Sequence, residues 1–120
     1  MKSIEFKGIP TFRINNYDEA IKFYVDFLGF TVDWEHRFSP AEPVYMQIAR
    51  NGLVIHLSEN KRFLSGCIIF IETKEIETFQ SELKNKHSQF FVPEIEITNW
   101  GTKQIEIKDP FENLLRFNQL

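Results

Sequence analysis

Apolar residues recur at helical spacing in the segment that follows Asn16. The stripe that they form consists of Ala20, Ile21, Tyr24, Phe27 and Leu28. Asn16 is a residue type that caps helix N-termini, and Glu19 stands three positions later, where the acid of a capping box belongs. Gly29 follows the stripe and suits the left-handed conformation that is common at helix C-termini. The pattern therefore predicts one helix between Asn16 and Gly29.

Alternating patterns predict strands on both sides of this helix. The predicted strands of the first half are 9–14, 30–36, 44–49 and 53–58. The last two are joined at Asn51-Gly52, a dipeptide that favours a type I′ hairpin turn because both residues tolerate positive φ.

A two-residue loop pairs Gln47 with His56 and sorts the side chains of this hairpin by face. One face is apolar and consists of Met46, Ile48, Ile55 and Leu57. The other face is amphipathic and consists of Tyr45, Gln47, His56 and Ser58. An apolar face is expected to pack on a helix, whereas an amphipathic face is typical of a lined cavity.

The same order of elements occurs again in the second half of the chain. Residues 67–72 predict a strand, and Thr73 predicts the cap of a helix whose stripe is Ile76, Phe79 and Leu83. Further strands are predicted at 90–92, 103–107 and 114–117, with a turn at 109–113, while residues 93–99 fit either a strand or a loop. A strand, a helix and three strands thus occur twice. This repeat indicates a single domain over residues 1–120, with one module at about 5–60 and another at about 65–120.

The composition is that of a globular protein with many aromatic side chains. The 120 residues include 13 Phe, which either fill a core or line a cavity. The net charge is −3 and no basic run is present, so we expect no nucleic-acid partner. No apolar run is as long as a membrane span, and Cys67 is the only cysteine, so we expect a cytoplasmic protein without membrane contact.

Three segments together resemble a known family. They read IPTFRINNYDEAIKFYVDFLGFTVDWEHRF, YMQIARNGLVIHLSE and WGTKQIEIKDPFENLLRF. Combined, they resemble bleomycin-resistance members of the vicinal-oxygen-chelate superfamily, to which glyoxalases and dioxygenases also belong. The resemblance implies an α+β fold of paired βαβββ modules that form a curled mixed sheet around a cavity. It also implies a homodimer with ligand clefts at the interface.

The chain departs from this family at Glu112, where glycine is usual in the turn. If the position requires positive φ, glutamate is strained there by roughly 1 kcal/mol.

The resemblance also implies where a metal ion is bound in the metal-dependent members, with one ligand on the first and last strand of each module. The corresponding positions here are Ile9, His56, Gly66 and Arg116, and a shift of one residue on the first strands offers Pro10 or Cys67 without restoring the site. Ile9 and Gly66 have no donor side chain and Arg116 is a cation, so three of the four do not hold a divalent ion. We therefore expect no metal and no other cofactor.

Seven residues are candidates for ligand contacts. They are Trp34, Tyr45, Gln47, His56, Trp100, Glu106 and Arg116. Trp34 and Trp100 are either core residues or stacking platforms for a planar ligand. Glu106 and Arg116 are expected on neighbouring strands, either as an internal ion pair or as ligand contacts. His56 is either held by Gln47 across the hairpin or free to act as a general base.

Two functions follow from these alternatives. The first is a metal-free small-molecule binding protein that sequesters a flat, drug-like compound, with a cationic compound as one option. The second is an enzyme of the same superfamily, a glyoxalase-type lyase or isomerase or a dioxygenase, that uses His56.

Overall fold

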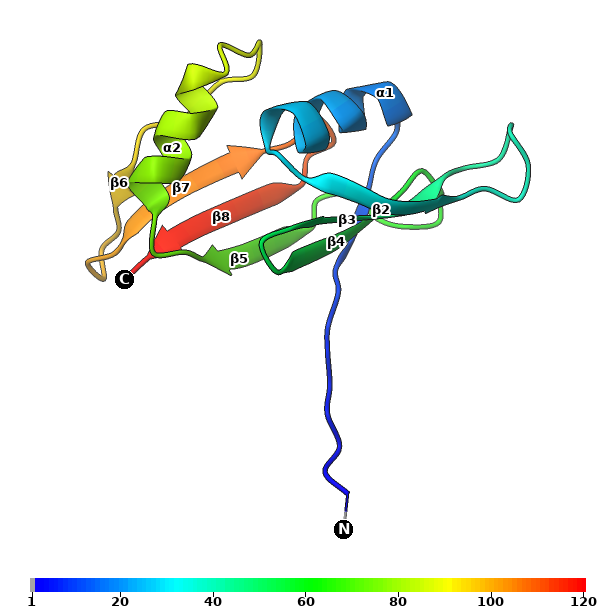
Figure 1. Ribbon diagram of the computed structural model, residues 1–120, viewed down its shortest axis with the longest axis horizontal. Helices are drawn as coiled ribbons and strands as arrows, with labels where there is room; N and C mark the ends of the chain where they lie inside the picture. The colour runs from blue at the N-terminus through cyan, green and yellow to red at the C-terminus, as the bar shows by residue number, and fades with distance from the viewer. Residues whose placement is uncertain (1) are drawn as a thin grey trace.

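The computed structural model describes residues 2–120, which form two four-stranded mixed sheets (Figure 1). The first sheet has the strand order β1-β4-β3-β2, and the second has the order β5-β8-β7-β6. The strands of the first are β1 (Thr11–Arg13), β2 (Thr31–His36), β3 (Tyr45–Arg50) and β4 (Leu53–Ser58). The strands of the second are β5 (Ile68–Glu72), β6 (Glu96–Ile97), β7 (Lys103–Lys108) and β8 (Leu114–Gln119). Only the pairs β1–β4 and β5–β8 are parallel, so the predicted α+β fold of paired βαβββ modules is confirmed.

The first helix begins where the sequence predicts. Helix α1 (Tyr17–Ala20) starts after Asn16, whose Oδ1 accepts a hydrogen bond from the Glu19 amide at 2.9 Å. Gly29 follows the helical segment with φ of +78°, the left-handed conformation expected at the C-terminal end.

The same helix then widens, which the sequence pattern does not predict. It continues as a π-helix, η1 (Ile21–Phe27), and the Leu28 amide donates to the carbonyl of Phe23, five residues earlier, at 2.9 Å. The wider turns direct both Phe23 and Tyr24 into the core, where each is at most 1 % exposed.

The second helix, α2 (Ile76–Asn85), takes its cap from another part of the chain. Thr73 was expected to cap it, but the Thr73 hydroxyl instead accepts from the Glu75 amide at 3.2 Å in the preceding turn. The Ile76 amide donates to Oε1 of Gln119 on β8 at 2.9 Å. The prediction of the cap was wrong because a side chain from a distant strand satisfies the first helical amide.

The prediction of a strand at 90–92 was also wrong, because the short strand β6 forms at Glu96–Ile97 instead. The ring of Phe90 packs against Phe23 and Phe27, with ring centroids 5.1 and 5.3 Å apart. The 90–92 segment therefore packs on the first helical segment through a side chain and joins no sheet.

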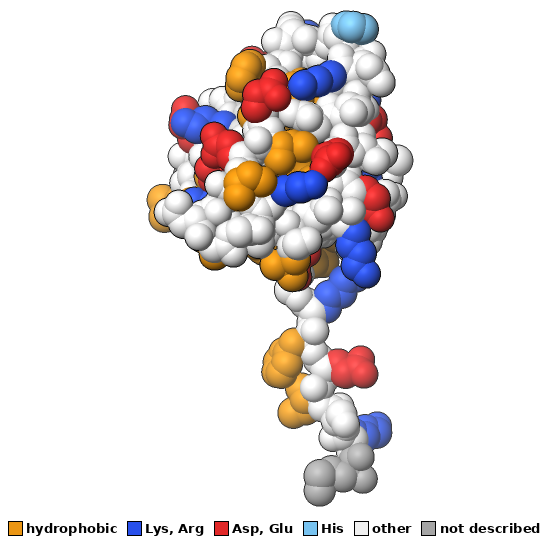
Figure 2. All heavy atoms as spheres, turned by 90° about the vertical axis from the view of Figure 1, so that its left-hand side faces the viewer, with side chains coloured by type: hydrophobic (Ala, Val, Ile, Leu, Met, Phe, Trp, Pro, Cys, Tyr) orange, Lys and Arg blue, Asp and Glu red, His pale blue; other side chains and the backbone are white. Residues whose placement is uncertain are grey.

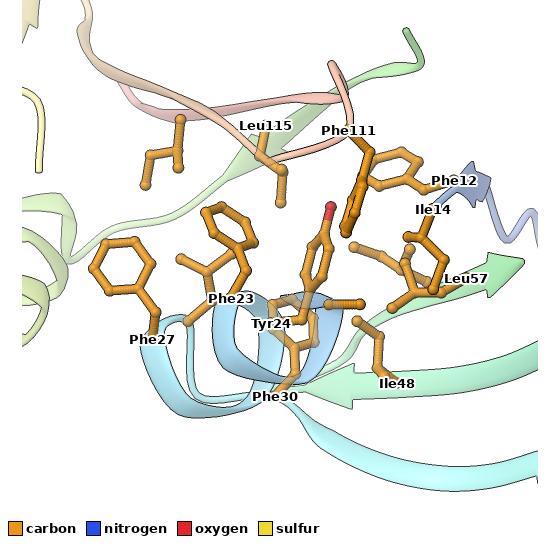
Figure 3. Packing of buried hydrophobic residues seen from close by; sticks show 14 of the residues in the cluster. Phe12, Ile14, Phe23, Tyr24, Phe27, Phe30, Ile48, Leu57, Phe111 and Leu115 are labelled. Carbon is orange, nitrogen blue, oxygen red and sulfur yellow. The ribbon is translucent and has the colours of Figure 1, made fainter. Parts of the chain in front are cut away.

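Both helical segments lie on the same side of the two sheets (Figure 1). The core fills the space between the helical segments and the sheets. In it, the side chains of Phe23 and Tyr24 point toward Phe111 and Leu115 from the second half of the chain (Figure 3). The hairpin residues Met46, Ile48, Ile55 and Leu57 are fully buried in this core, as their face predicts. Within residues 2–120 no helix covers the opposite side of the sheets, and we call that side the open face (Figure 1).

A buried carboxylate joins the two halves of the chain. Asp109, at the end of β7, is 4 % exposed, and its Oδ1 accepts from the amides of Phe111 and Asn113, both at 2.8 Å. Its Oδ2 accepts from the Tyr24 hydroxyl at 2.5 Å and from Nδ2 of Asn113 at 2.9 Å. Burial raises the pKa of the Asp109 carboxyl, while these hydrogen bonds act in the opposite direction.

An N-terminal arm, residues 2–8, forms no helix or strand and extends away from the rest of the molecule (Figures 1 and 2). Its apolar side chains are almost fully in solvent, with Ile4 80 % and Phe6 91 % exposed. None of the helices within residues 2–120 is long and apolar enough to cross a membrane.

The turn at residues 109–113 places Glu112 in the left-handed region, with φ of +72°. Replacing Glu112 with glycine is therefore expected to raise the free energy of unfolding by about 1 kcal/mol, because glycine adopts this φ without a Cβ clash. The ion pair lost with Lys108 is 3.3 Å long and exposed, so it offsets little of this gain. Chemical denaturation of both proteins measures the difference.

Glu94 provides the matched control for this substitution. It is also an exposed glutamate with a lysine partner, Lys84 at 3.4 Å, but it is not among the residues with positive φ. Glu94→Gly should bring no gain in stability. An equal gain from both substitutions would contradict strain at Glu112 as the cause.

Candidate ligand-binding site

The open face of the first sheet brings four side chains into one row. Strand register places Thr11 of β1 beside His56 of β4, His56 beside Gln47 of β3, and Gln47 beside Trp34 of β2. These four strands all lie in one sheet, so the row is held by main-chain hydrogen bonds and not by a loop. The predicted pairing of Gln47 with His56 is confirmed.

Hydrogen bonds fix both nitrogens of the His56 ring. Oε1 of Gln47 lies 2.9 Å from Nε2 and, as a carbonyl oxygen, accepts from it. Nδ1 of the neutral ring is then an acceptor, and the Tyr45 hydroxyl donates to it at 2.8 Å. The Thr11 hydroxyl lies 3.1 Å from the oxygen of Tyr45 and completes the chain of polar contacts. Burial lowers the pKa of His56 below its usual 6.5, so the ring is neutral at pH 7.

Aromatic rings cover the same row. The Trp34 indole is nearly parallel to the Tyr45 ring, with centroids 6.1 Å apart, and meets the edge of His56 at 5.3 Å. Phe63, from the segment between the two sheets, lies 6.4 Å from Tyr45. Trp34 is 42 % exposed, so part of its surface is available to a planar molecule.

The open face of the second sheet carries an ion pair. Nε of Arg116 on β8 donates to Oε2 of Glu106 on β7 at 2.7 Å, and both side chains are about two-fifths exposed. Of the two readings that the sequence leaves open, the ion pair is therefore formed. Phe70 of β5 pairs with Arg116 in the sheet and is half-exposed, which extends the face with apolar surface.

The seven candidates do not form one cluster within the chain. Trp34, Tyr45, Gln47 and His56 lie together on the first sheet, and Glu106 and Arg116 lie together on the second. Trp100 lies in the turn between β6 and β7, is 67 % exposed, and has no aromatic or hydrogen-bond contact with the other six in the described residues.

Three residues of the first open face were missed from the sequence, namely Thr11, Arg13 and Phe63. Thr11 and Arg13 flank the buried Phe12 in β1, so strand alternation alone could have placed them on the same face as His56. Phe63 carries no such signal because it lies outside any strand.

Comparisons with known proteins agree with this architecture. A family model described as glyoxalase superfamily protein matches residues 1–120. The chain belongs to the glyoxalase superfamily. No curated protein sequence matches it. The superfamily prediction made from the sequence is thus confirmed.

Solved structures with a similar fold include three that are named for antibiotic binding or for bleomycin resistance. A bleomycin resistance determinant encoded on the transposon Tn5 is 18 % identical with a TM-score of 0.74, covering 96 % of this chain and 98 % of that one. A bleomycin-binding protein complexed with bleomycin is 19 % identical with a TM-score of 0.72, covering 97 % and 99 %. TnmS3, an antibiotic binding protein from Streptomyces sp. CB03234, is 18 % identical with a TM-score of 0.68, covering 98 % of each chain.

The metal site of metal-dependent glyoxalase-superfamily members is not reproduced by the residues at the corresponding places. Ile9 and Gly66 were assigned to two of them, but β1 begins at Thr11 and β5 at Ile68, so both residues precede their strands. This assignment was wrong because the strands start later than their apolar patterns suggest.

Register puts Thr11 beside His56 and Phe70 beside Arg116. Phe70 has no donor atom, and Arg116 is a cation already bound to Glu106. Within residues 2–120, no three His, Cys, Asp or Glu side chains are close enough to share an ion. This donor set does not fit a divalent metal.

A well-defined groove lies elsewhere, between α2, β5 and the β3–β4 turn. It has a volume of about 740 Å³, and its lining includes Phe70, Phe79 and Phe117 but none of the seven candidates. Two of its polar side chains, Arg50 and Glu82, are already hydrogen-bonded to each other, because Arg50 donates to both carboxylate oxygens of Glu82 at 2.7 Å. The open face is the better candidate because its rings and hydrogen-bonding groups lie on one accessible surface.

Proposed function

We propose that this protein binds a planar small molecule on the open face and sequesters it without chemical change. The observation that carries this proposal is the exposed Trp34 indole, held in place by Tyr45 and His56. Rings positioned by a sheet lose little conformational entropy on binding, and planar groups pack well on an indole. The similar structures named for bleomycin or antibiotic binding support this function.

The state of His56 favours binding over catalysis. A general base needs a free lone pair directed at its substrate, but both ring nitrogens of His56 are engaged by Gln47 and Tyr45. The residues beside His56 and Arg116, which are Thr11 and Phe70, do not form a ligand set for a metal ion that would act as a Lewis acid. A lyase, isomerase or dioxygenase reaction therefore lacks its usual groups at this site.

We further propose that the protein is a homodimer whose ligand clefts lie between the subunits. In one chain the two open faces are uncovered, and Ile68 and Phe70 on β5 remain more than half exposed. The arm at residues 2–8 reaches about 25 Å when extended and carries Ile4 and Phe6, which are 80 % and 91 % exposed. Burying this apolar surface against a second copy supplies a driving force for association. Sedimentation measurements with and without residues 2–8 test the dimer.

A fluorescence titration tests the binding proposal. In a Trp100→Phe background Trp34 is the only tryptophan, so its emission reports on the open face. We expect a saturable change on adding naphthalene-2-carboxamide, and we test bleomycin in parallel. Mass spectrometry should recover the probe unchanged.

Trp34→Ala should abolish binding measured by calorimetry, whereas Trp100→Ala, which removes the other exposed indole, should leave it intact. If neither probe shows binding that depends on Trp34 at high micromolar concentration, the proposed function is wrong.

A further inference from the structure

Arg13 is a cation on the open face that no carboxylate of the described part of the chain neutralises. It follows the buried Phe12 in β1, and register places it beside Ser58, which in turn pairs with Tyr45. Arg13, Ser58 and Tyr45 therefore form a second row, adjacent to the row that contains His56, and Arg13 lies two strands away from Tyr45. No Asp or Glu in residues 2–120 is within salt-bridge distance of it.

The hydrogen-bonding capacity of this guanidinium is largely unused. Its Nη1 donates to the Phe63 carbonyl at a long 3.3 Å, and within the described residues this is its only hydrogen bond. Its Nε is buried and has no acceptor within residues 2–120. Arginine normally satisfies five N–H donors, and a buried donor without an acceptor is unfavourable. Nη2 has no hydrogen bond in residues 2–120 either, but it is not among the buried atoms, so it can donate to an acceptor supplied by another molecule.

Charge varies across the open face of the first sheet. At the β1 edge, Arg62 adds a second cation, with its Cζ 4.8 Å from the Phe63 ring and no ion pair in residues 2–120. The carboxylate that reaches the central row is Asp33, which accepts from Nε2 of Gln47 at 2.9 Å and lies on β2, at the opposite edge. Tyr45 lies on β3, between these two edges, and its ring stacks on Trp34, which lies on β2 next to Asp33.

We propose that the ligand of this site carries an anionic oxygen group beside its planar ring, and that Arg13 binds this group. The inference rests on the proposed function and adds the chemical class of the ligand. A carboxylate or similar group at the β1 edge accepts from the Arg13 guanidinium in the planar geometry that arginine favours. The attached ring then lies over Tyr45 and Trp34. A cationic ligand, one option from the sequence, is disfavoured at this edge.

Three probes that share one ring system test the proposal. They are naphthalene-2-carboxylate, its neutral carboxamide, and 2-naphthylmethylammonium, each titrated by calorimetry at fixed ionic strength. A charge-assisted hydrogen bond corresponds to roughly tenfold to hundredfold in affinity. We expect the carboxylate to bind at least about tenfold more tightly than the ammonium compound, with the carboxamide between them.

Variants separate recognition by Arg13 from a structural role. Arg13→Met should weaken the carboxylate by about tenfold or more and change the carboxamide by less than about threefold. Arg13→Lys, which keeps the charge without the planar fork, should retain part of the preference for the carboxylate. Arg50→Met is the matched control, because Arg50 lies away from the open face, in the groove beside α2, and is bound by Glu82.

The outcomes distinguish this inference from the proposed function. Binding that depends on Trp34 but is equally strong for all three probes overturns the role of Arg13 and leaves the binding function intact. Equal weakening of carboxylate and carboxamide by Arg13→Met also overturns it, since that result indicates a purely structural arginine. No Trp34-dependent binding of any probe overturns both.

Discussion

Replacing Asp109 with alanine is expected to lower the free energy of unfolding by about 3–5 kcal/mol. The substitution leaves three buried donors without their acceptor, namely the Tyr24 hydroxyl and the amides of Phe111 and Asn113, and it removes one of the two acceptors of Asn113 Nδ2. Each buried donor that loses its partner costs roughly 1–3 kcal/mol, and the losses are not additive because the turn relaxes. Chemical denaturation followed by circular dichroism measures the change.

Two further variants define the origin of this effect. Asp26→Ala makes the same change at an exposed helical position and should alter stability by less than about 0.5 kcal/mol. Tyr24→Phe removes only the hydroxyl and should cost roughly 1–2 kcal/mol. A double-mutant cycle between Tyr24 and Asp109 should give a clear coupling energy. A loss below about 1 kcal/mol for Asp109→Ala would show that the buried hydrogen bonds contribute little.

This buried turn also matters for the candidate site. Nδ2 of Asn113 donates to the main-chain carbonyl of Arg13 at 3.0 Å, so the turn holds the end of β1. Thr11 and Arg13 project from this strand onto the open face. We therefore expect that loosening the turn affects the ligand face as well as global stability.

Phe23→Ala is expected to destabilise the fold by a similar amount, about 3–5 kcal/mol. Phe23 is 1 % exposed and packs edge-on against Tyr24 at 4.9 Å and against Phe90 at 5.1 Å. Removing its ring leaves a cavity where the first helical segment meets residues of the second half. Thermal and denaturant unfolding of the variant should both show the loss.

Phe91→Ala is the matched control, because Phe91 is the next phenylalanine beyond Phe90 in the chain and is 81 % exposed. It should change stability by less than about 0.5 kcal/mol. Comparable losses from the two substitutions would mean that exposure in the structure does not decide which Phe residues stabilise the fold.

Local sequence signals predicted much of the scaffold because they act through nearest neighbours. Asn51-Gly52 adopts positive φ at both residues, and the register that follows from a two-residue loop is the one observed. Asn16 caps the first helix through its own side chain. Strand alternation then assigned Tyr45, Gln47 and His56 to a single face.

The predictions that failed all depended on contacts between distant parts of the chain. The cap of α2 comes from Gln119, and Phe90 is drawn away from the sheet by the first helical segment. The start of β1 determines that Thr11, and not Ile9, lies beside His56. In each case the deciding partner is at least 40 residues away, beyond the reach of any local pattern.

The sequence by itself determined the α+β scaffold, the hairpin register and the pairing of His56 with Gln47, because turn chemistry and side-chain alternation are local properties. The tertiary structure decided which candidates meet. It stacked Trp34 on Tyr45, left Trp100 apart in an exposed turn, and placed Arg13 on the open face without a carboxylate partner. These outcomes depend on how strands from distant segments align in a sheet, and that alignment is set by the packing of the whole core.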